Sequence, residues 1–257
     1  ETRIRKVLAE PFRNREFRSF ITFMSFWHFA AMVGAPFISL FLLAEVGMSL
    51  SRLLLLWMFC WIGGAICSAR IGGLAERFGH RPILILCTFL KSSNMLALML
   101  IPNDPERAFL ILIPVFILDS ILNAGFVVAT NGFMLTKSPS GNRTMFIAAG
   151  TALAGLIGGV TSVICGGLLT WGRLDSVVLG VPLSAYRILF AVSLLLRIAS
   201  VLLAVRIRES GSHGTRYVVS QLIGATPLRL IHFPVGLFRS ETTEQKPLQT
   251  NSTVERV

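Results

Sequence analysis

Long apolar runs alternate with short polar segments along most of the chain. An α-helix rises about 1.5 Å per residue, so each run is long enough to cross a hydrocarbon core of about 30 Å. The pattern therefore predicts an all-α, polytopic membrane protein with six transmembrane helices. The predicted helices cover residues 20–43, 50–71, 82–101, 108–136, 145–171 and 186–205.

Residues with special backbone preferences mark breaks and ends in this pattern. Gly34 and Pro36 interrupt the first run near its middle. Such a break is tolerated in a membrane where a neighbouring helix or a water-lined cavity satisfies the freed carbonyl. Ser49 or Ser51 is expected to cap the start of the second helix, and Pro82 suits the first turn of the third.

The two ends of the chain are polar. Residues 1–19 form a basic segment, residues 20–206 contain the six-helix bundle, and residues 207–257 form a tail that we expect to be partly disordered. The chain opens on Glu1, with neither an initiator Met nor a secretion signal. We interpret the sequence as a fragment of a longer protein.

Basic residues indicate the orientation in the membrane. They gather before the first run, in 70–81, in 137–143 and at the start of the tail. Cytoplasmic loops carry an excess of Lys and Arg, so this side is expected to be cytoplasmic, with both chain ends on it. We expect a multi-pass protein of the cell (inner) membrane. The opposite side receives only Arg52, Arg107, Arg173 and Arg187.

Composition narrows the class further. Of the 257 residues, 53% are hydrophobic and 14% are charged, against about 25% charged in soluble domains. The net charge is +11, but the basic residues lie mainly in the loops between apolar runs. Membrane topology accounts for most of them, so we expect no nucleic-acid partner. The four cysteines all lie in apolar runs and lack metal-ligand spacing. We expect no metal and no cofactor.

A charged, glycine-rich segment joins the second and third runs. This hinge segment, residues 72–84, reads Gly-Gly-Leu-Ala-Glu-Arg-Phe-Gly-His-Arg-Pro-Ile-Leu. A connection this short is expected to return the two helices side by side, with its charges at a water-facing surface. It resembles the sequence G-x-L-A-D-R-x-G-R-K-x-x-L, which major facilitator superfamily transporters carry between the second and third helices of a six-helix half. The positions that match outright are Gly72, Leu74, Ala75, Arg77, Gly79 and Leu84.

The resemblance implies one six-helix half of such a transporter, and the basic start and polar end favour the C-terminal half. Glu76 takes the place of the motif's Asp, and His80 and Arg81 take those of its two basic residues. In the family, the acid and the arginine latch helix ends on the cytoplasmic side and release during alternating access. The resemblance therefore implies a conformational latch loop at Gly72, Glu76, Arg77, Gly79 and Arg81. The partners that it implies are a small-molecule solute, a coupling proton or ion, membrane lipid and the other six-helix half.

Four ionisable residues lie deep in the apolar runs, where charge is costly. They are His28, Lys91, Asp119 and Arg197. The depths of Lys91 and Asp119 allow the two to meet. One interpretation is a structural ion pair between neighbouring helices, and the other is that Asp119 binds a substrate cation or a proton.

Two polar stripes follow the helical period. Asp119, Asn123 and Thr130 share one face of the fourth run, and Ser25 and His28 share a face of the first. In the family the first and fourth helices line the central cavity, so the resemblance places both stripes toward the substrate. It also places Lys91 and Arg197 on peripheral helices, where structural pairing or snorkelling is expected.

Three functions agree with this sequence. The first is a secondary active transporter half that moves an unidentified small solute by alternating access. The second is a non-transporting scaffold or sensor of the same fold, since fold does not fix function. The third is an intramembrane enzyme, although the nearest nucleophile-like string, 138–141, lies in a polar loop. We favour the transporter and expect no enzymatic activity.

Overall fold

The computed structural model describes six helical spans and the short connections between most of them. The described residues belong to the compact unit Glu1–Val218. The expectations for the basic segment before residue 15 and for nearly all of the tail lie outside them. The described residues are 15–138, 143–171, 176–178, 181–207, 215 and 218.

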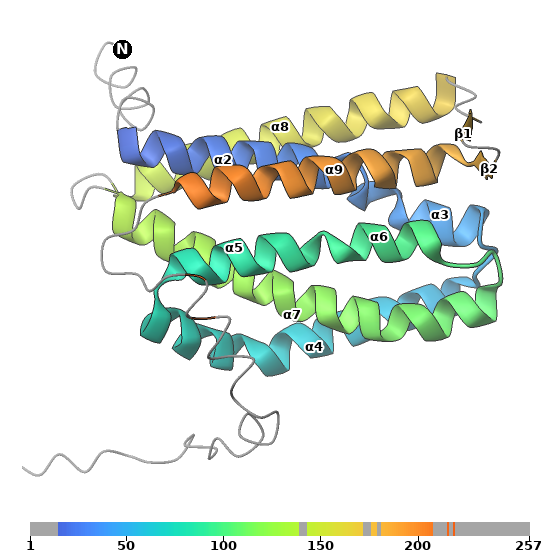
Figure 1. Ribbon diagram of the computed structural model, residues 1–257, viewed down its shortest axis with the longest axis horizontal. Coiled ribbons are helices and arrows are strands. Elements are labelled where there is room, and N and C mark those ends of the chain that lie inside the picture. The colour runs from blue at the N-terminus through green and yellow to red at the C-terminus, as the bar shows by residue number, and fades with distance from the viewer. Residues whose placement is uncertain are drawn as a thin grey trace, which may run out of the picture. The chain divides into compact units, whose positions relative to one another are not determined.

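The helices run back and forth beside one another (Figure 1). Six of the described segments are long and apolar enough to cross a membrane. The prediction of an all-α, multi-pass membrane protein is thereby confirmed. In chain order the helical elements are α2 (Arg15–Met32), η1 (Ala35–Phe37), α3 (Ile38–Ala44), α4 (Leu50–Phe78), α5 (His80–Lys91), α6 (Ser93–Leu100), α7 (Pro105–Lys137), α8 (Arg143–Trp171) and α9 (Ala185–Arg206).

The bundle has two ends, which differ in their connections (Figure 1). The start of α2, the α4–α5 and α7–α8 connections and the end of α9 lie at one end, which we call the hinge end. The opposite end, the far end, holds the α3–α4 and α6–α7 turns and a small hairpin before α9. In the hairpin, β1 (Ser176–Val178) pairs antiparallel with β2 (Val181–Leu183).

Polar side chains cap the helices that begin at the far end. Ser49 Oγ accepts a hydrogen bond from the Arg52 amide at 3.4 Å, which confirms the expected cap of α4. Asp104 Oδ1 accepts from the Glu106 amide at 2.9 Å at the start of α7. Ser184 accepts from the Arg187 amide at 3.4 Å at the start of α9. Each cap satisfies a backbone donor that the first helical turn leaves open.

Two of the spans are broken near their middles. The first breaks between α2 and α3, where Gly34 and Pro36 were expected to interrupt it. The third breaks at Ser92, between α5 and α6, which the sequence pattern did not predict. Near that break the hydroxyls of Thr88 and Ser92 donate to the carbonyls of Leu84 and Thr88 four residues earlier. Hydroxyls that bond back to their own helix in this way commonly bend it.

The hinge segment is more helical than expected. Helix α4 continues to Phe78 and α5 starts at His80, so Gly79 alone joins them. Gly79 has φ of 92°, a conformation that is strained for residues with a Cβ. The expectation that the two helices return side by side is largely wrong. Helix α4 packs chiefly against α7, and α5 packs against α7 and α9.

Small residues allow α4 and α7 to pack closely. A Cβ on Gly64 would lie 2.6 Å from Ser120 Oγ of α7, and one on Gly63 would lie 3.0 Å from the Ile117 carbonyl oxygen. Small residues at a crossing let helix backbones approach in lipid, where association depends on close packing. The close crossing helps to hold Asp119, beside Ser120, within the bundle.

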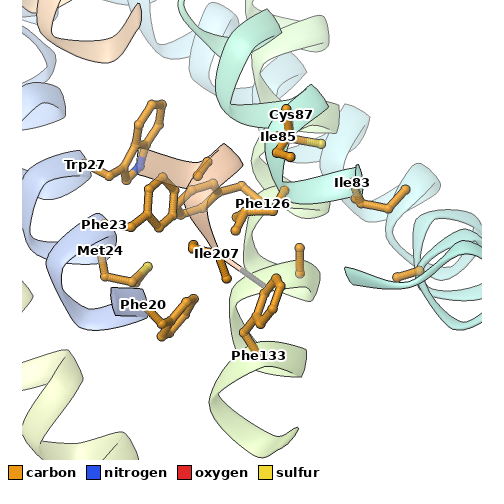
Figure 2. Close-up of a cluster of buried hydrophobic side chains, with 14 of the residues drawn as sticks. Phe20, Phe23, Met24, Trp27, Ile83, Ile85, Cys87, Phe126, Phe133 and Ile207 are labelled. Carbon is orange, nitrogen blue, oxygen red and sulfur yellow. The ribbon is translucent and has the colours of Figure 1, made fainter. Parts of the chain in front are cut away.

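Toward the hinge end, aromatic side chains from α2 and α7 form the centre of the core (Figure 2). The rings of Phe20 and Phe133 stack with centroids 5.5 Å apart, and those of Trp27 and Phe126 lie 5.0 Å apart. Residues of α5 and Ile207 cover this cluster. Bulky rings dominate such packing because each buries a large area. The cluster fixes α2 against α7 just beside the polar centre of the bundle.

Large apolar side chains also cover the outside of the bundle. Trp61 of α4 and Val163 and Trp171 of α8 are among the most exposed of them. A soluble monomer rarely exposes contiguous apolar patches of this kind. The distribution is the one expected for helices that face lipid or another membrane helix.

Candidate functional site

A cavity of about 300 Å³ lies between the two broken spans, α4, α7 and α9. Its aromatic lining residues are Trp27, Trp57, Phe116 and Phe126. Several other lining groups are polar. They are His28, Lys91, Asn94, Asp119, Asn123 and Arg197. An apolar concavity with a few convergent polar groups is the usual form of a small-molecule site.

Lys91 joins α5 to two residues of α7. Its Nζ lies 3.3 Å from Asp119 Oδ2 and donates to Asn123 Oδ1 at 2.9 Å. Asp119 and Asn123 are four residues apart, so both fall on one helical face. The side chains of Lys91 and Asp119 are 13% and 19% exposed. The prediction that these two residues meet is confirmed.

Arg197 reaches the cavity from α9. It is 2% exposed, and its guanidinium lies 5.5 Å from the centre of the Trp27 ring. Its Nη1 donates to the Lys91 carbonyl at 3.4 Å and its Nη2 to the Ala31 carbonyl at 3.5 Å. Among the described residues, Arg197 forms no ion pair.

The two helix breaks free the Lys91 and Ala30 carbonyls, and α9 donates a hydrogen bond to each. At Ser92 the Met95 amide donates to the Ser92 carbonyl, so Lys91 loses the acceptor role it would have in a continuous helix. At the first break the Gly34 amide donates to Ala31 rather than to Ala30. Ser193 Oγ of α9 then donates to the freed Ala30 carbonyl at 2.7 Å. Freed carbonyls inside a membrane need such partners.

Several polar atoms at the cavity remain unsatisfied within the described part of the chain. They are Asp119 Oδ1, Asn94 Oδ1 and Arg197 Nε, all buried and without a hydrogen-bond partner there. Each belongs to a residue that lines the cavity. Buried polar atoms usually have a partner, so three exceptions at one cavity call for an explanation such as a bound molecule or water.

The structure brings together only some of the predicted substrate-site residues. Asp119, Asn123 and His28 line the cavity, and His28 Nδ1 lies 2.9 Å from the Met24 carbonyl oxygen. Thr130 and Ser25 do not line it. The Thr130 hydroxyl instead donates to the Phe126 carbonyl of its own helix at 2.8 Å. Ser25 Oγ is buried, with no hydrogen-bond partner among the described residues.

The predicted latch residues lie apart from the cavity, at the hinge end. Gly72 lies within α4, and Glu76 and Arg77 are exposed near the end of that helix. Within the described ranges, Glu76 forms no ion pair with Arg143 at the start of α8. Arg81, at the start of α5, donates to the Val205 carbonyl of α9 at 2.9 Å.

The structural pairing expected of Lys91 is present in its contact with Asp119. The resemblance also implied peripheral helices for Lys91 and Arg197, but both residues line the cavity. Asn94, three residues after Lys91, also lines the cavity. Trp27 and Cys60 were not expected there at all. The signal for Arg197 was present in the sequence as an arginine far from both ends of an apolar run, with Ser193 one turn before it.

No protein family, curated protein or solved structure matches this chain. The resemblance to major facilitator transporters therefore rests on the hinge segment and on the six spans. Within the described residues, no group of three or more His, Cys, Asp or Glu side chains could hold a metal ion.

Proposed function

We propose that this chain is one six-helix half of a secondary active transporter and that the central cavity is part of its solute site. A second six-helix half of the same protein would close the site from the opposite side. The solute is a small molecule, and a proton or another ion couples its movement. The basic hinge end faces the cytoplasm of the cell (inner) membrane, and the far end faces outward.

The observation that carries this proposal is the set of unsatisfied charged and amide groups around a cavity deep in the bundle. Polar and ionisable residues inside a membrane are costly and commonly mark substrate or ion pathways. The Lys91–Asp119–Asn123 contacts use some of these groups, while Asp119 Oδ1, Asn94 Oδ1 and Arg197 Nε remain open among the described residues. If these contacts only held α5 against α7, they would need no adjoining cavity of about 300 Å³.

The two helix breaks support a moving site. Both lie where their spans border the cavity, and α9 donates to the carbonyls that they free. Broken helices at membrane depth are typical of transporter binding sites. A change of bend at either break would change the width of the cavity.

The hinge segment supplies the second element of the proposal. Glu76 and Arg77 are exposed at the end of α4, so they are free to meet a helix end of the other half in one state and to separate from it in another. Exposed ion pairs contribute at most about 1 kcal/mol, which suits a contact that must form and break. We assign this segment to the control of exchange between states rather than to solute affinity.

Accessibility of Cys60 from the two sides of the membrane tests the transport proposal. Cys60 is half-buried and lines the cavity. In the complete protein, with the other three cysteines of this chain changed to alanine, a membrane-impermeant maleimide should label Cys60 in both right-side-out and inside-out vesicles. A matched variant keeps Cys67 instead, about two turns further along α4, and should lack two-sided labelling. Labelling of Cys60 from one side only would support a scaffold or sensor instead.

The orientation can be checked in the same vesicles. Cysteines placed at Asn103 and Ser176, at the far end, should react from outside, and one placed at Lys137, at the hinge end, should react only from inside. Strong labelling at Lys137 from outside would contradict the orientation.

A further inference from the structure

Three ionisable side chains on the cavity wall do not balance in charge when all three are ionised. They are Lys91, Arg197 and Asp119. Asp119 contacts Lys91, and Arg197 has no carboxylate within ion-pair distance in the described part of the chain. One positive charge is therefore left over at a depth where an uncompensated charge is costly.

We propose that the cavity binds a small organic monoanion. Its acidic group lies against Arg197, and its apolar body lies against the aromatic residues that line the cavity. This inference rests on the proposed function, because it takes the cavity as a solute site, and it adds the chemical class of the solute.

Arg197 has donors to spare for an acidic group. A guanidinium carries five N–H donors. Two of them point at carbonyls at 3.4 and 3.5 Å, which is long for N–H···O bonds, and Nε has no partner among the described residues. The planar fork of an arginine matches a carboxylate and binds it through two parallel hydrogen bonds.

The rest of the wall matches a molecule with one polar end. Asn94 is 7% exposed, and its Oδ1 has no partner in the described part of the chain. Its carboxamide carries both a donor and an acceptor, so it can bond to an acid beside Arg197. Trp27, Trp57 and Phe116 also line the cavity and supply apolar surface. A volume of about 300 Å³ is at the small end of the range for ligand pockets, which limits the size of the body.

The open oxygen of Asp119 raises the alternative of a zwitterion, whose ammonium group would bind there. Asp119 already lies 3.3 Å from the Lys91 ammonium, however, and shares its charge with it. A zwitterion adds no net charge, so it would leave the excess positive charge in place. A monoanion removes it, and a hydroxyl or water suffices to donate to Asp119 Oδ1.

Four probes that share one aromatic ring separate these possibilities. They are benzoate, benzamide, benzylammonium and phenylalanine, which are an anion, a neutral isostere, a cation and a zwitterion. A ligand that binds the folded state raises the midpoint of thermal unfolding. We expect benzoate at millimolar concentration to raise the midpoint of the purified protein, and the other three to leave it unchanged. An equal or larger rise with any of those three, or no rise with benzoate, would overturn the proposal.

An isosteric substitution places the missing negative charge on the wall itself. In Asn94→Asp the new carboxylate takes the place of the solute's charge, and we expect benzoate to bind at least about tenfold more weakly. Asn103→Asp makes the same change in the α6–α7 turn, away from the cavity, and should bind benzoate as the unmodified protein does. If Asn94→Asp does not fold, Arg197→Lys serves as the deciding variant. It keeps the positive charge but loses the planar guanidinium that would bind the carboxylate through two hydrogen bonds. Unchanged benzoate affinity in the deciding variant would contradict the proposal.

The two proposals fail in different ways. Stabilisation by benzoate together with one-sided labelling of Cys60 would keep the anion site and remove the transport function. Two-sided labelling without any effect of benzoate would keep the transport function and show that its solute is not a monoanion of this kind.

Discussion

Two arginines on α9 have very different surroundings. Arg187, at the far end, lies 3.5 Å from Glu45 and donates to the Ile101 carbonyl at 3.1 Å and to Asn103 Oδ1 at 2.5 Å. Arg197, ten residues later at the centre of the bundle, has two long bonds to carbonyls and a neighbouring tryptophan ring. The first arginine is paired with a carboxylate, and the second is not paired among the described residues.

The comparison separates a structural role from a binding role. Arg187 ties the end of α3, the end of α6 and the start of α9 together, and its charge is matched by Glu45, with the side chains 20% and 19% exposed. Arg197 contributes two weak bonds and a contact with the Trp27 ring to the fold, and no carboxylate lies within ion-pair distance of it among the described residues. A buried charge without a partner does not stabilise a protein, so its presence favours a role outside folding.

The largest effect on stability is expected at Asp119, the carboxylate on the cavity wall. Asp119→Asn leaves Lys91 buried without its counter-charge, and breaking a buried ion pair costs about 3 kcal/mol. We expect the free energy of unfolding to fall by that amount and solute transport to be lost. Equilibrium unfolding and two-sided labelling of Cys60 measure the two effects.

The charge swap Asp119→Lys with Lys91→Asp sharpens this result. It keeps the pair and its net charge but exchanges the two groups between α5 and α7. We expect stability to return to within about 1 kcal/mol of the original, since the pair re-forms, while transport stays lost. Full transport with an unchanged pH profile in the swapped protein would make the pair purely structural.

An intermediate effect is expected at the far end. Arg187→Met removes charge-assisted hydrogen bonds to two groups of the α6–α7 connection and leaves Glu45 without its partner, which we expect to cost about 2 kcal/mol of unfolding free energy. Benzoate should still raise the unfolding midpoint of this variant as in the unmodified protein. A lost benzoate effect would show that the two arginines do not have separate roles.

The smallest effect on binding is expected at the hinge end. Glu76→Ala removes an exposed charge that contributes less than about 1 kcal/mol. We expect the exchange of Cys60 between the two accessible states to slow, while benzoate affinity stays within a few-fold. A large loss of affinity with unchanged exchange would argue against a latch at Glu76.

Much of the fold could be predicted because apolar length and capping chemistry are local properties of the sequence. The six spans, the Ser49 cap and the break at Gly34 and Pro36 follow from them. The depths of Lys91 and Asp119 in their apolar runs also sufficed to predict that the two residues meet. The break at Ser92 was missed because no glycine or proline marks it, and serine and threonine in a helix bend it only in some contexts.

The neighbours of α9 could not be predicted from the sequence in the same way. Periodicity gives the faces of a helix but not the helices that lie against them. The family resemblance suggested a peripheral place for Arg197, and the structure places it on the cavity wall. The sequence correctly located the connection between the second and third spans at the hinge segment. The loop there is shorter than expected, because helix continues on both sides of Gly79.

In the proposed site, Arg197 holds a charge for the solute rather than for the fold. The most direct test is the unfolding midpoint of Arg197→Met, measured with and without benzoate beside Arg187→Met. We predict that Arg197→Met unfolds within about 1 kcal/mol of the unmodified protein, because the loss of two long bonds is offset by removal of an unpaired buried charge, and that benzoate no longer raises its midpoint. A variant that is severely destabilised, or that still responds to benzoate, would contradict the claim.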